Sequence, residues 1–475
     1  MAAHQAATAA GPATAATAVL AVKPRWRPTT RAAAALTVAA LAFTTAGCAG
    51  AGGGGGNENK TVTIATVANP QMQDIEKLSS EFKKDHPDVK LRFVTLPENE
   101  LRDRVTQDIA TKGGQYDVVT IGTYETPIWA KNGWLTKLDG YASKGDYDVE
   151  DLIPPVREAL SYKDNMYAVP FYGESSFLMY RKDLFDKAGI TMPSNPTWAQ
   201  VASYAKKLNN PDKKIAGICL RGLPGWGEVL APLDTVILTF GGRWYDEKWH
   251  AQLTSPDTVR AVKFYVDLVR KYGEAGAPNA GFSECLTATG QGNAAMWYDA
   301  TVAAGSLEDP KTSKVAGKMG YVAAPVDKTK ASGWLWAWSL AIPNTSKKKD
   351  AAWEFVSWAT SKKYLKLVGD KLGWARVPPG SRLSTYDIPE YKDAAGAFAG
   401  PTLDSIQNVN VKQPGVYPQP WVGVQYVAIP EFQDLGTKVS QEISAAIAGR
   451  QSVEEALAKA QKYADDTAKK GGYQK

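Results

Sequence analysis

Along the first part of the chain, hydrophobic residues recur with two spacings, at every second position in some segments and at every third or fourth position in others. Strands are predicted at 61–67, 89–93 and 116–121. Between them apolar residues recur every three to four positions, which predicts a helix after Asn69-Pro70 and another around Leu101–Ile109. This order of strands and helices is typical of a parallel α/β sheet. Ligands of such sheets bind beyond the carboxyl ends of the strands, which makes the loops 68–71 and 122–125 candidates for a site.

The alternation continues towards the C-terminus. Further strands are predicted at 177–180, 294–298 and 334–342. Further helices are predicted at 198–208, 261–272, 350–366 and 453–468, with Asp350 as the N-cap of the third. A chain of 475 residues is too long for one hydrophobic core, so the sequence predicts an α/β protein with two lobes.

The N-terminal segment has the composition of an export signal. Lys and Arg residues precede an apolar stretch at 32–43, which is shorter than the roughly 20 residues of a transmembrane helix. Cys48 follows, and glycines occupy 52–56. We therefore expect a lipoprotein signal peptide over 1–48 that ends at a lipidated Cys48, with 49–60 as a Gly-rich tether. The mature protein would then work at the extracellular face of the cell membrane, held by its lipid anchor.

One residue of this signal departs from the usual pattern. Thr45 stands three positions before Cys48, where an aliphatic residue is usual. The alternative is therefore an ordinary secretory peptide with a chance cysteine.

Charge and histidine content argue against several kinds of function. The leader holds four Lys and Arg and no acid, so the net charge falls to +6 − 4 = +2 without it, and no basic stripe indicates a nucleic-acid partner. Beyond the leader, His86 and His250 lack the spacing of a metal site or a catalytic triad. No phosphate- or dinucleotide-binding glycine motif occurs. We therefore expect no metal and no cofactor.

Cysteines and aromatic residues add two further hints. In an exported protein Cys219 and Cys285 favour a disulfide, with two buried free thiols as the alternative. The chain has 15 Trp and 21 Tyr. Flat aromatic rings stack on the C–H faces of polyhydroxy compounds, although most of these rings are expected to fill the core.

Short motifs occur in a fixed order over nearly the whole chain after the leader. They include Tyr116-Asp117-Val118-Val119, Tyr167-Ala168-Val169-Pro170, Pro196-Thr197-Trp198, Gly292-Asn293-Ala294-Ala295-Met296 and Ala351-Ala352-Trp353-Glu354-Phe355. The set resembles the extracellular solute-binding proteins of ABC importers, in the maltose-binding-like group. A second set resembles the sorbitol- and mannitol-binding members. It comprises Pro170-Phe171-Tyr172-Gly173-Glu174-Ser175-Ser176, Cys219-Leu220-Arg221-Gly222-Leu223-Pro224-Gly225-Trp226-Gly227-Glu228 and Trp297-Tyr298-Asp299-Ala300-Thr301.

The resemblance implies a periplasmic-binding-protein-like fold, with a hinge between two lobes and a ligand cleft at their interface. Lobe 1 is expected to comprise 61–170 and 298–350, and lobe 2 to comprise 171–297 and 351–475. The implied protein is a monomer and not an enzyme. It captures a sugar alcohol, or a related sugar, and delivers it to ABC permease subunits in the membrane.

A polyol is neutral and rich in hydroxyl groups, so its site needs ionised or amide side chains and an aromatic floor. Residues of these types lie near the expected crossings and in loops. They are Tyr124, Glu125, Tyr172, Glu174, Arg221, Trp226, Asp299, Trp336, Trp338 and Arg376, with Glu228 and Gln425 as weaker candidates.

Each candidate also has a structural interpretation. Carboxylates in loops are often solvated, Arg221 could pair with a local acid, and alternate Trp residues along a strand usually pack in the core. A secreted carbohydrate-active hydrolase is the main alternative function, with Glu125, Glu174 and Asp299 as its acid, base or nucleophile. A sensor or adhesion lipoprotein for the same ligand is a third interpretation.

Overall fold

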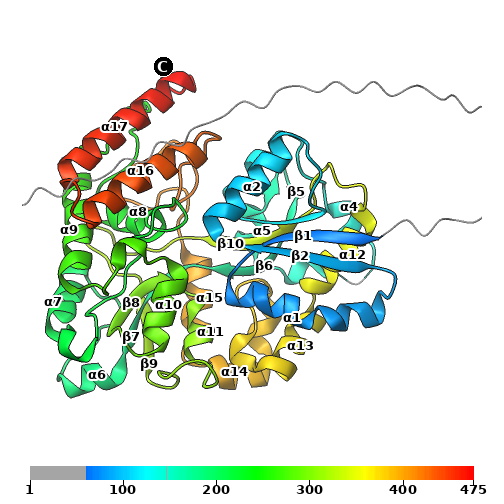
Figure 1. Cartoon of the computed structure of the whole chain (residues 1–475), viewed down its shortest axis with the longest axis horizontal. Helices are drawn as coiled ribbons and strands as arrows, with labels where there is room; N and C mark the ends of the chain where they lie inside the picture. Colours follow the sequence, from blue (N-terminus) through cyan, green and yellow to red (C-terminus); the bar gives the residue numbers. More distant parts are fainter. Residues whose placement is uncertain (1–59, 146, 475) are drawn as a thin grey trace, which may run out of the picture. The chain divides into compact units, whose positions relative to one another are not determined.

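Two β-sheets organise the residues that the computed structural model describes, which are 60–145 and 147–474 (Figure 1). The predicted signal peptide, Cys48 and the tether up to residue 59 lie outside them. Within these residues, no helix has both the length and the apolar character that crossing a bilayer requires.

The first sheet has five strands, and we call it with its helices the first lobe. Its strands, in spatial order, are β2 (Lys90–Leu96), β1 (Thr61–Val67), β3 (Val118–Ile121), β10 (Trp336–Ala341) and β6 (Ala168–Glu174). β1 pairs in parallel with β2 and β3 as predicted, whereas β10 is antiparallel to both of its neighbours. The strand β10 enters this sheet from the opposite direction, because the chain returns to it from the second sheet.

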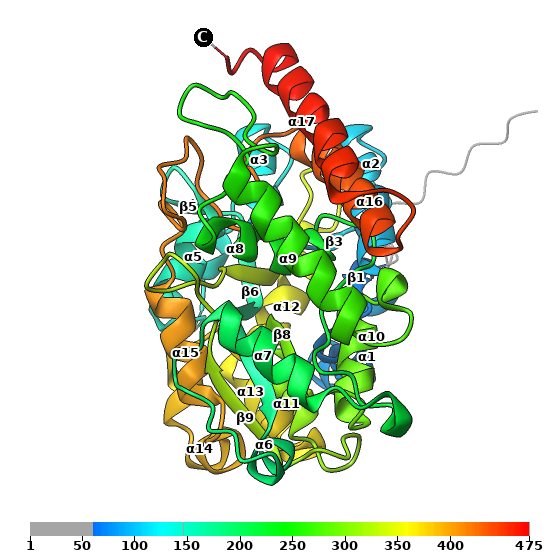
Figure 2. The same cartoon turned by 90° about the vertical axis from the view of Figure 1, so that its left-hand side faces the viewer.

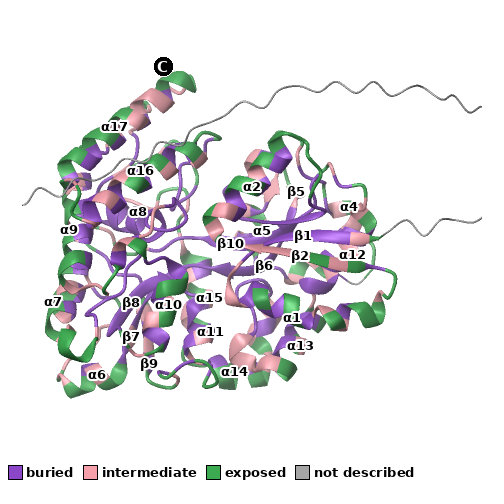
Figure 3. Ribbon diagram, in the orientation of Figure 1, coloured by how far each residue is buried: buried purple, intermediate pink, exposed green. Residues whose placement is uncertain are grey.

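Helices cover both faces of this sheet. They are α1 (Pro70–Asp85), α2 (Glu98–Ala110), α3 (Glu125–Lys131), α4 (Asp139–Ala142), α5 (Pro154–Ala159), α12 (Lys349–Ala359) and α13 (Lys362–Leu372). A short hairpin of β4 (Ser161–Tyr162) and β5 (Asn165–Met166) accompanies them. The predicted apolar face of α1 is buried, including Met72, Ile75 and Phe82. Buried positions line the strands and inner helix faces, and exposed ones lie outside (Figure 3).

The second sheet has three antiparallel strands, and we call it with its helices the second lobe. Its strands, in spatial order, are β8 (Met296–Ala300), β7 (Ser176–Arg181) and β9 (Met319–Ala323). Its helices are α6 (Lys182–Lys187), α7 (Trp198–Leu208), α8 (Leu230–Thr239), α9 (Pro256–Tyr272), α10 (Phe282–Gly290), α11 (Ala303–Leu307), α16 (Phe432–Ile447) and α17 (Val453–Lys470). The C-terminal pair α16 and α17 packs together against α9 (Figure 2). Two more helices, α14 (Pro389–Ala395) and α15 (Ala399–Asn408), follow α13, and α15 contacts strands of both sheets.

The sheets correct the predicted lobe boundaries. The first crossing falls at Ser175, between β6 and β7, rather than before residue 171. The segment 298–323 lies with the second lobe, because β8 pairs along its full length with β7 and β9 pairs on the other side. The segment 351–372 lies with the first lobe, because α12 packs against α1 and α13 against α12.

The helix predicted at 350–366 is two helices. α12 ends at Ala359, and α13 begins at Lys362 with Ser361 as its N-cap. The Ser361 hydroxyl accepts a hydrogen bond from the Tyr364 backbone N–H, which starts a new helix instead of continuing the old one. Lys348, not Asp350, occupies the N-cap of α12, and Asp350 lies in its first turn.

A disulfide bond joins Cys219 to Cys285. It ties the segment that leads into Arg221 to helix α10, and both segments contribute to the site described next.

Candidate ligand-binding site

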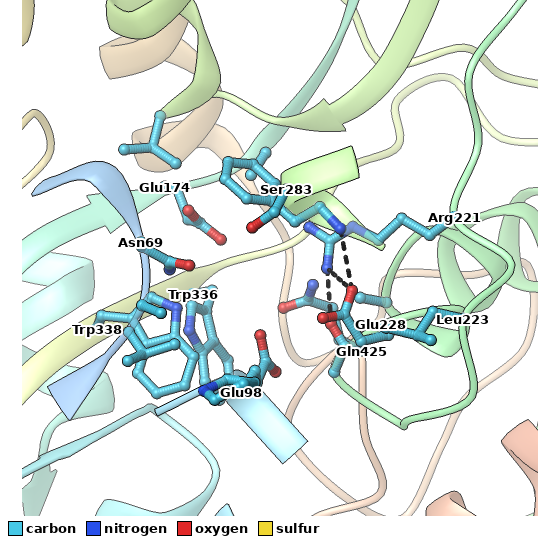
Figure 4. A pocket seen from close by; sticks show the side chains of 18 of the residues that line it. Asn69, Glu98, Glu174, Arg221, Leu223, Glu228, Ser283, Trp336, Trp338 and Gln425 are labelled. Atoms are coloured by element: carbon cyan, nitrogen blue, oxygen red, sulfur yellow. Dashed lines mark hydrogen bonds and ion pairs between the residues drawn. The ribbon is translucent and has the colours of Figure 1, made fainter. Parts of the chain in front are cut away.

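A cavity of about 220 Å³ lies between the two lobes (Figure 4). The first lobe contributes the loops after β1 and β2, the end of β6 and part of β10, and the second lobe contributes the segment around 221–231 and the start of α10. The loop 68–71 supplies Ala68 and Asn69, as its place beyond a parallel strand predicted. No residue of the loop 122–125 lines the cavity.

Three indole rings form an aromatic wall. Trp336 and Trp338 lie two apart on β10 and therefore on one face, with ring centroids 5.6 Å apart in an edge-to-face arrangement. Trp226 comes from the second lobe, with its ring 5.8 Å from that of Trp336. Gly122 makes room for this wall, because a Cβ there would collide with the Trp336 ring. The sequence therefore identified the three indoles that meet at the cavity.

Arg102 is a cavity residue that the sequence analysis missed. It lies on α2 and pairs with Glu98, four residues earlier, at 2.9 Å and with Glu125. Its guanidinium carbon lies 4.0–5.0 Å from the centroids of all three indoles of the wall. An i,i+4 acid–arginine pair at the start of a helix was the signal available, but such pairs are usually exposed.

Arg221 forms the opposite wall and is held from behind by Asp299. The Arg221 Nε and Nη2 donate to the two carboxylate oxygens of Asp299 at 2.8 and 2.5 Å, and Nη1 donates to the Gly227 carbonyl at 2.7 Å. The Trp297 indole also donates to Asp299, at 3.0 Å. Asp299 is fully buried and does not line the cavity, which differs from the expected direct ligand contact. Both carboxylate oxygens of Asp299 instead accept hydrogen bonds from the guanidinium of Arg221.

Glu174 is the buried carboxylate that faces the cavity without an ion-pair partner among the described residues (Figure 4). Burial raises the pKa of Glu174 to about 8. The Arg221 charge lowers this pKa, whereas the charges of Asp299 and Glu98 raise it. An oxygen-rich group is thus held in the cavity with its hydrogen-bonding capacity largely unused.

Two further lining residues were weaker candidates. Glu228 lies 3.4 Å from Arg221 Nη1 and accepts a hydrogen bond from the Phe282 backbone N–H at 3.1 Å. Burial raises the pKa of Glu228 to about 7, against the lowering effect of Arg221. Gln425 is buried, and within the described residues its Oε1 has no hydrogen-bond partner. Both side chains therefore offer acceptors to a ligand.

Tyr172 lines the cavity as predicted and contacts a residue that was not predicted. The Asn69 amide donates to the Tyr172 hydroxyl at 2.8 Å. Asn69 precedes Pro70 at the start of α1, yet its side chain does not cap the helix. It is therefore available to the cavity, which the helix-start pattern alone could not reveal.

Tyr124 and Glu125 lie behind the cavity wall, not in it. The Tyr124 hydroxyl donates to the Ile429 carbonyl at 3.0 Å, and its ring packs edge-on against Trp226. Glu125 is held by Arg102 and accepts a hydrogen bond from the Gly122 backbone N–H at 2.9 Å. The polar atoms of Tyr124 and Glu125 are therefore paired within the fold. The two residues support Trp226 and Arg102, which line the cavity.

Arg376 also lies outside the cavity. Its Nη2 is 2.6 Å from Asp74 on α1, and its Nη1 is 3.0 Å from Asp309, in the turn after α11. Both aspartate side chains are almost fully buried. Arg376 therefore joins the first lobe to the second instead of presenting a donor to the ligand.

The arrangement suits binding more than hydrolysis. Of the three carboxylates considered for catalysis, only Glu174 lines the cavity. Glu125 and Asp299 lie outside it and pair with Arg102 and Arg221. Aromatic rings on one side and charged hydrogen-bonding groups on the other fit a compact polyhydroxy ligand.

A sequence profile of the bacterial extracellular solute-binding proteins matches residues 68–366. The chain belongs to this family. The mannitol-binding protein of Pseudomonas aeruginosa is 47% identical over 416 residues, which are 87% of this chain and 94% of the relative. Membership confirms the expected family and the expectation of a binding protein rather than an enzyme.

Solved structures agree with this membership. An ABC transporter solute-binding protein from Agrobacterium vitis S4, with bound D-mannitol, matches with a TM-score of 0.86 and 52% identity, covering 87% of this chain and 100% of that one. A protein from Agrobacterium radiobacter K84 in complex with ribitol has a TM-score of 0.75 and 27% identity, covering 86% and 98%. The maltose-bound MalE3 of T. maritima, at 20% identity and a TM-score of 0.73 over 86% and 99%, shares the fold. The predicted two-lobed α/β fold is confirmed.

Proposed function

We propose that this protein is the substrate-binding component of an ABC importer and that it captures an acyclic sugar alcohol of the mannitol or sorbitol type. The observation that carries this is the cavity itself, which sets Glu174 and Arg221 opposite the indoles Trp336 and Trp338. Ionised groups make strong hydrogen bonds to hydroxyls, and indoles cover the C–H faces between them. The names of the mannitol-binding relative and of the mannitol and ribitol complexes support the same ligand class.

The size of the cavity favours a single small polyol. Drug-sized ligands usually occupy about 300–1,000 Å³, whereas this cavity measures about 220 Å³. We assign direct ligand contacts to seven side chains. Asp299 acts indirectly, because it holds the guanidinium of Arg221 in place. The seven are Asn69, Tyr172, Glu174, Arg221, Trp226, Trp336 and Trp338, with Glu98, Arg102, Glu228 and Gln425 around them.

Delivery to the importer completes the proposal. Cys48 carries a lipid after signal-peptide cleavage, and the monomeric protein hands its ligand to permease subunits in the membrane. Tethering keeps the local concentration of the receptor at the membrane high. Incorporation of labelled palmitate into the wild-type protein, and its loss in Cys48→Ala, tests the anchor. Equal labelling of the two proteins would refute it.

Calorimetric titration of the mature protein with mannitol, sorbitol, xylitol, glucose and maltose tests the ligand class. We expect saturable binding of a hexitol, weaker binding of xylitol and glucose, and no turnover. Glu174→Gln should weaken hexitol binding by about tenfold or more at about pH 9, where the Glu174 carboxyl group is ionised and its charge-assisted hydrogen bond to a ligand hydroxyl is lost in the variant. Glu150→Gln is the matched control, since that side chain is 86% exposed. A clear preference for maltose would refute the polyol proposal.

A further inference from the structure

Carboxylates outnumber cationic groups around the cavity. Arg102 pairs with two carboxylates and Arg221 lies next to two others. A fifth and a sixth carboxylate, those of Glu174 and Glu284, have no arginine partner among the described residues. With all groups ionised, which for Glu174 and Glu228 holds only above their raised pKa values of about 8 and about 7, two guanidinium and six carboxylate charges give 2 − 6 = −4. The six carboxylates are those of Glu98, Glu125, Glu174, Glu228, Glu284 and Asp299.

This excess is concentrated at Glu174. Glu174 is 6% exposed, and its side chain points into the cavity between Asn69 and the second-lobe wall (Figure 4). Three charged groups act on it, from different elements: Arg221 in the segment before α8, Asp299 on β8 and Glu98 on α2. Two of the three are acidic, and the Arg221 charge is already shared with Asp299. A ligand that places a positive charge beside Glu174 would neutralise part of this excess negative charge.

We infer that the cavity also binds cationic amino-alditols, in which an amino group replaces a terminal hydroxyl, with the ammonium beside Glu174, and that it excludes anionic alditol derivatives. This rests on the proposed function. An ammonium offers three N–H donors and a charge to a buried carboxylate that receives only hydroxyl donors from a neutral alditol. The exchange of –OH for –NH₃⁺ keeps the number of heavy atoms, so the ligand still fits. A phosphate or carboxylate would add negative charge where it is already in excess.

The same geometry makes amine binding depend on pH more steeply than binding of the neutral alditol, because an ion pair gains more from an ionised Glu174 than a hydrogen bond to a hydroxyl does. Burial raises the pKa of Glu174 to about 8, so an ion pair formed below that pH requires the carboxyl group to release a proton. Raising the pH from about 6 to about 8 reduces this requirement, because about half of the Glu174 carboxyl groups are then ionised, while a primary amine remains largely protonated. The affinity of the amine relative to the alditol should therefore rise over this range.

The test is calorimetry with 1-amino-1-deoxymannitol, mannitol, mannitol 1-phosphate and mannonate. We expect the ratio of amine to mannitol affinity to rise at least about threefold between about pH 6 and about pH 8. Proton release should accompany amine binding near pH 6, seen as a dependence of the heat on buffer ionisation enthalpy. The phosphate and the acid should bind about a hundredfold more weakly than mannitol, or not detectably.

Variants of Glu174 connect the effect to this residue. Glu174→Gln keeps the shape but cannot ionise, so the pH-dependent rise in the ratio should disappear, whereas Glu150→Gln should keep it. Glu174→Asp is a second variant that retains the charge and should keep a reduced rise. Thermal unfolding of each variant shows whether it is folded.

The outcomes separate this inference from the proposed function. Mannitol binding with a pH-independent ratio, or with an amine bound about tenfold more weakly near pH 8 than mannitol, would overturn the inference alone. A ratio that rises equally in Glu174→Gln would also overturn it. Binding of neither mannitol nor sorbitol would overturn the proposed function.

Discussion

Asp299 holds Arg221 through two parallel hydrogen bonds, 2.8 Å from Nε to Oδ2 and 2.5 Å from Nη2 to Oδ1. With Nη1 bonded to the Gly227 carbonyl, the orientation of the guanidinium is fixed before any ligand arrives. The cavity therefore presents a preorganised donor, because little side-chain freedom remains to be lost on binding.

Asp299→Asn should weaken hexitol binding by at least about tenfold, although Asp299 does not line the cavity. It should also lower the free energy of unfolding by about 3–5 kcal/mol, because a buried guanidinium loses its charged partner. Calorimetry and urea unfolding measure the two effects. Asp434→Asn, whose side chain is 72% exposed, is the control and should change neither. Unchanged hexitol affinity in Asp299→Asn would contradict the role assigned to this pair.

Gly227→Ala should weaken hexitol binding with little change in thermal stability. A Cβ at Gly227, in the second lobe, would collide with the Glu98 carboxylate of the first lobe, so the lobes could not approach as closely. The neighbouring contact from Asn99 Nδ2 to the Pro224 carbonyl, 2.9 Å, would be strained as well. We expect a loss of about tenfold or more in affinity. Gly400→Ala is the matched control, because a Cβ there meets nothing within 4 Å. Equal affinities for the two variants would argue against closure at this point.

Arg376→Met should destabilise the protein by about 3–5 kcal/mol, because two buried aspartates lose their shared cation. Urea unfolding measures the loss. Addition of Asp74→Asn should recover part of it, since one of the two stranded charges is then removed. Arg104→Met, at an exposed pair with Glu100, is the control and should cost less than about 1 kcal/mol. A double variant no more stable than Arg376→Met would show that the lobe-joining contact is not electrostatic.

The ligand-free protein should lose stability as the pH rises from about 5 to about 8. Burial raises the pKa of Glu174 to about 8 and those of Glu228 and Glu274 to about 7, so these groups bind protons more tightly when folded than when unfolded. Their contribution is fully present below an unfolded pKa of about 4.3 and is lost as the pH passes the folded values.

Thermal unfolding across this pH range measures the effect. The slope should be shallower in Glu174→Gln and unchanged in Glu150→Gln. Identical slopes for wild type and Glu174→Gln would show that the Glu174 carboxyl group does not take part.

Local sequence patterns revealed those parts of the fold that depend on the spacing of neighbouring residues. The alternation around Thr61–Val67 and the apolar face of α1 define elements whose buried side is visible in the sequence. The loop after β1 and the alternate indoles of β10 could be placed at the site for the same reason, since a strand has two faces and a parallel sheet has one carboxyl edge.

Other features could not be seen in the sequence, because they depend on which distant groups meet. Nothing near Arg376 shows that it pairs with Asp74, 302 positions earlier, instead of with a ligand. Arg102 looks like an exposed helix residue until three indoles from both lobes surround it. The boundaries of the lobes likewise followed from strand pairing, since 298–323 joins the sheet in which its hydrogen-bond partners lie.

The sequence by itself determined the α/β order, the family and eight of the side chains that line the cavity, because periodicity and ordered motifs are local properties of the chain. Only the tertiary structure decided which charges are paired. In the folded chain Asp299 pairs with Arg221, Arg376 pairs with two aspartates, and Glu174 faces the cavity. The physical reason is that a buried charge takes the nearest partner in space, and that partner is set by packing rather than by position along the chain.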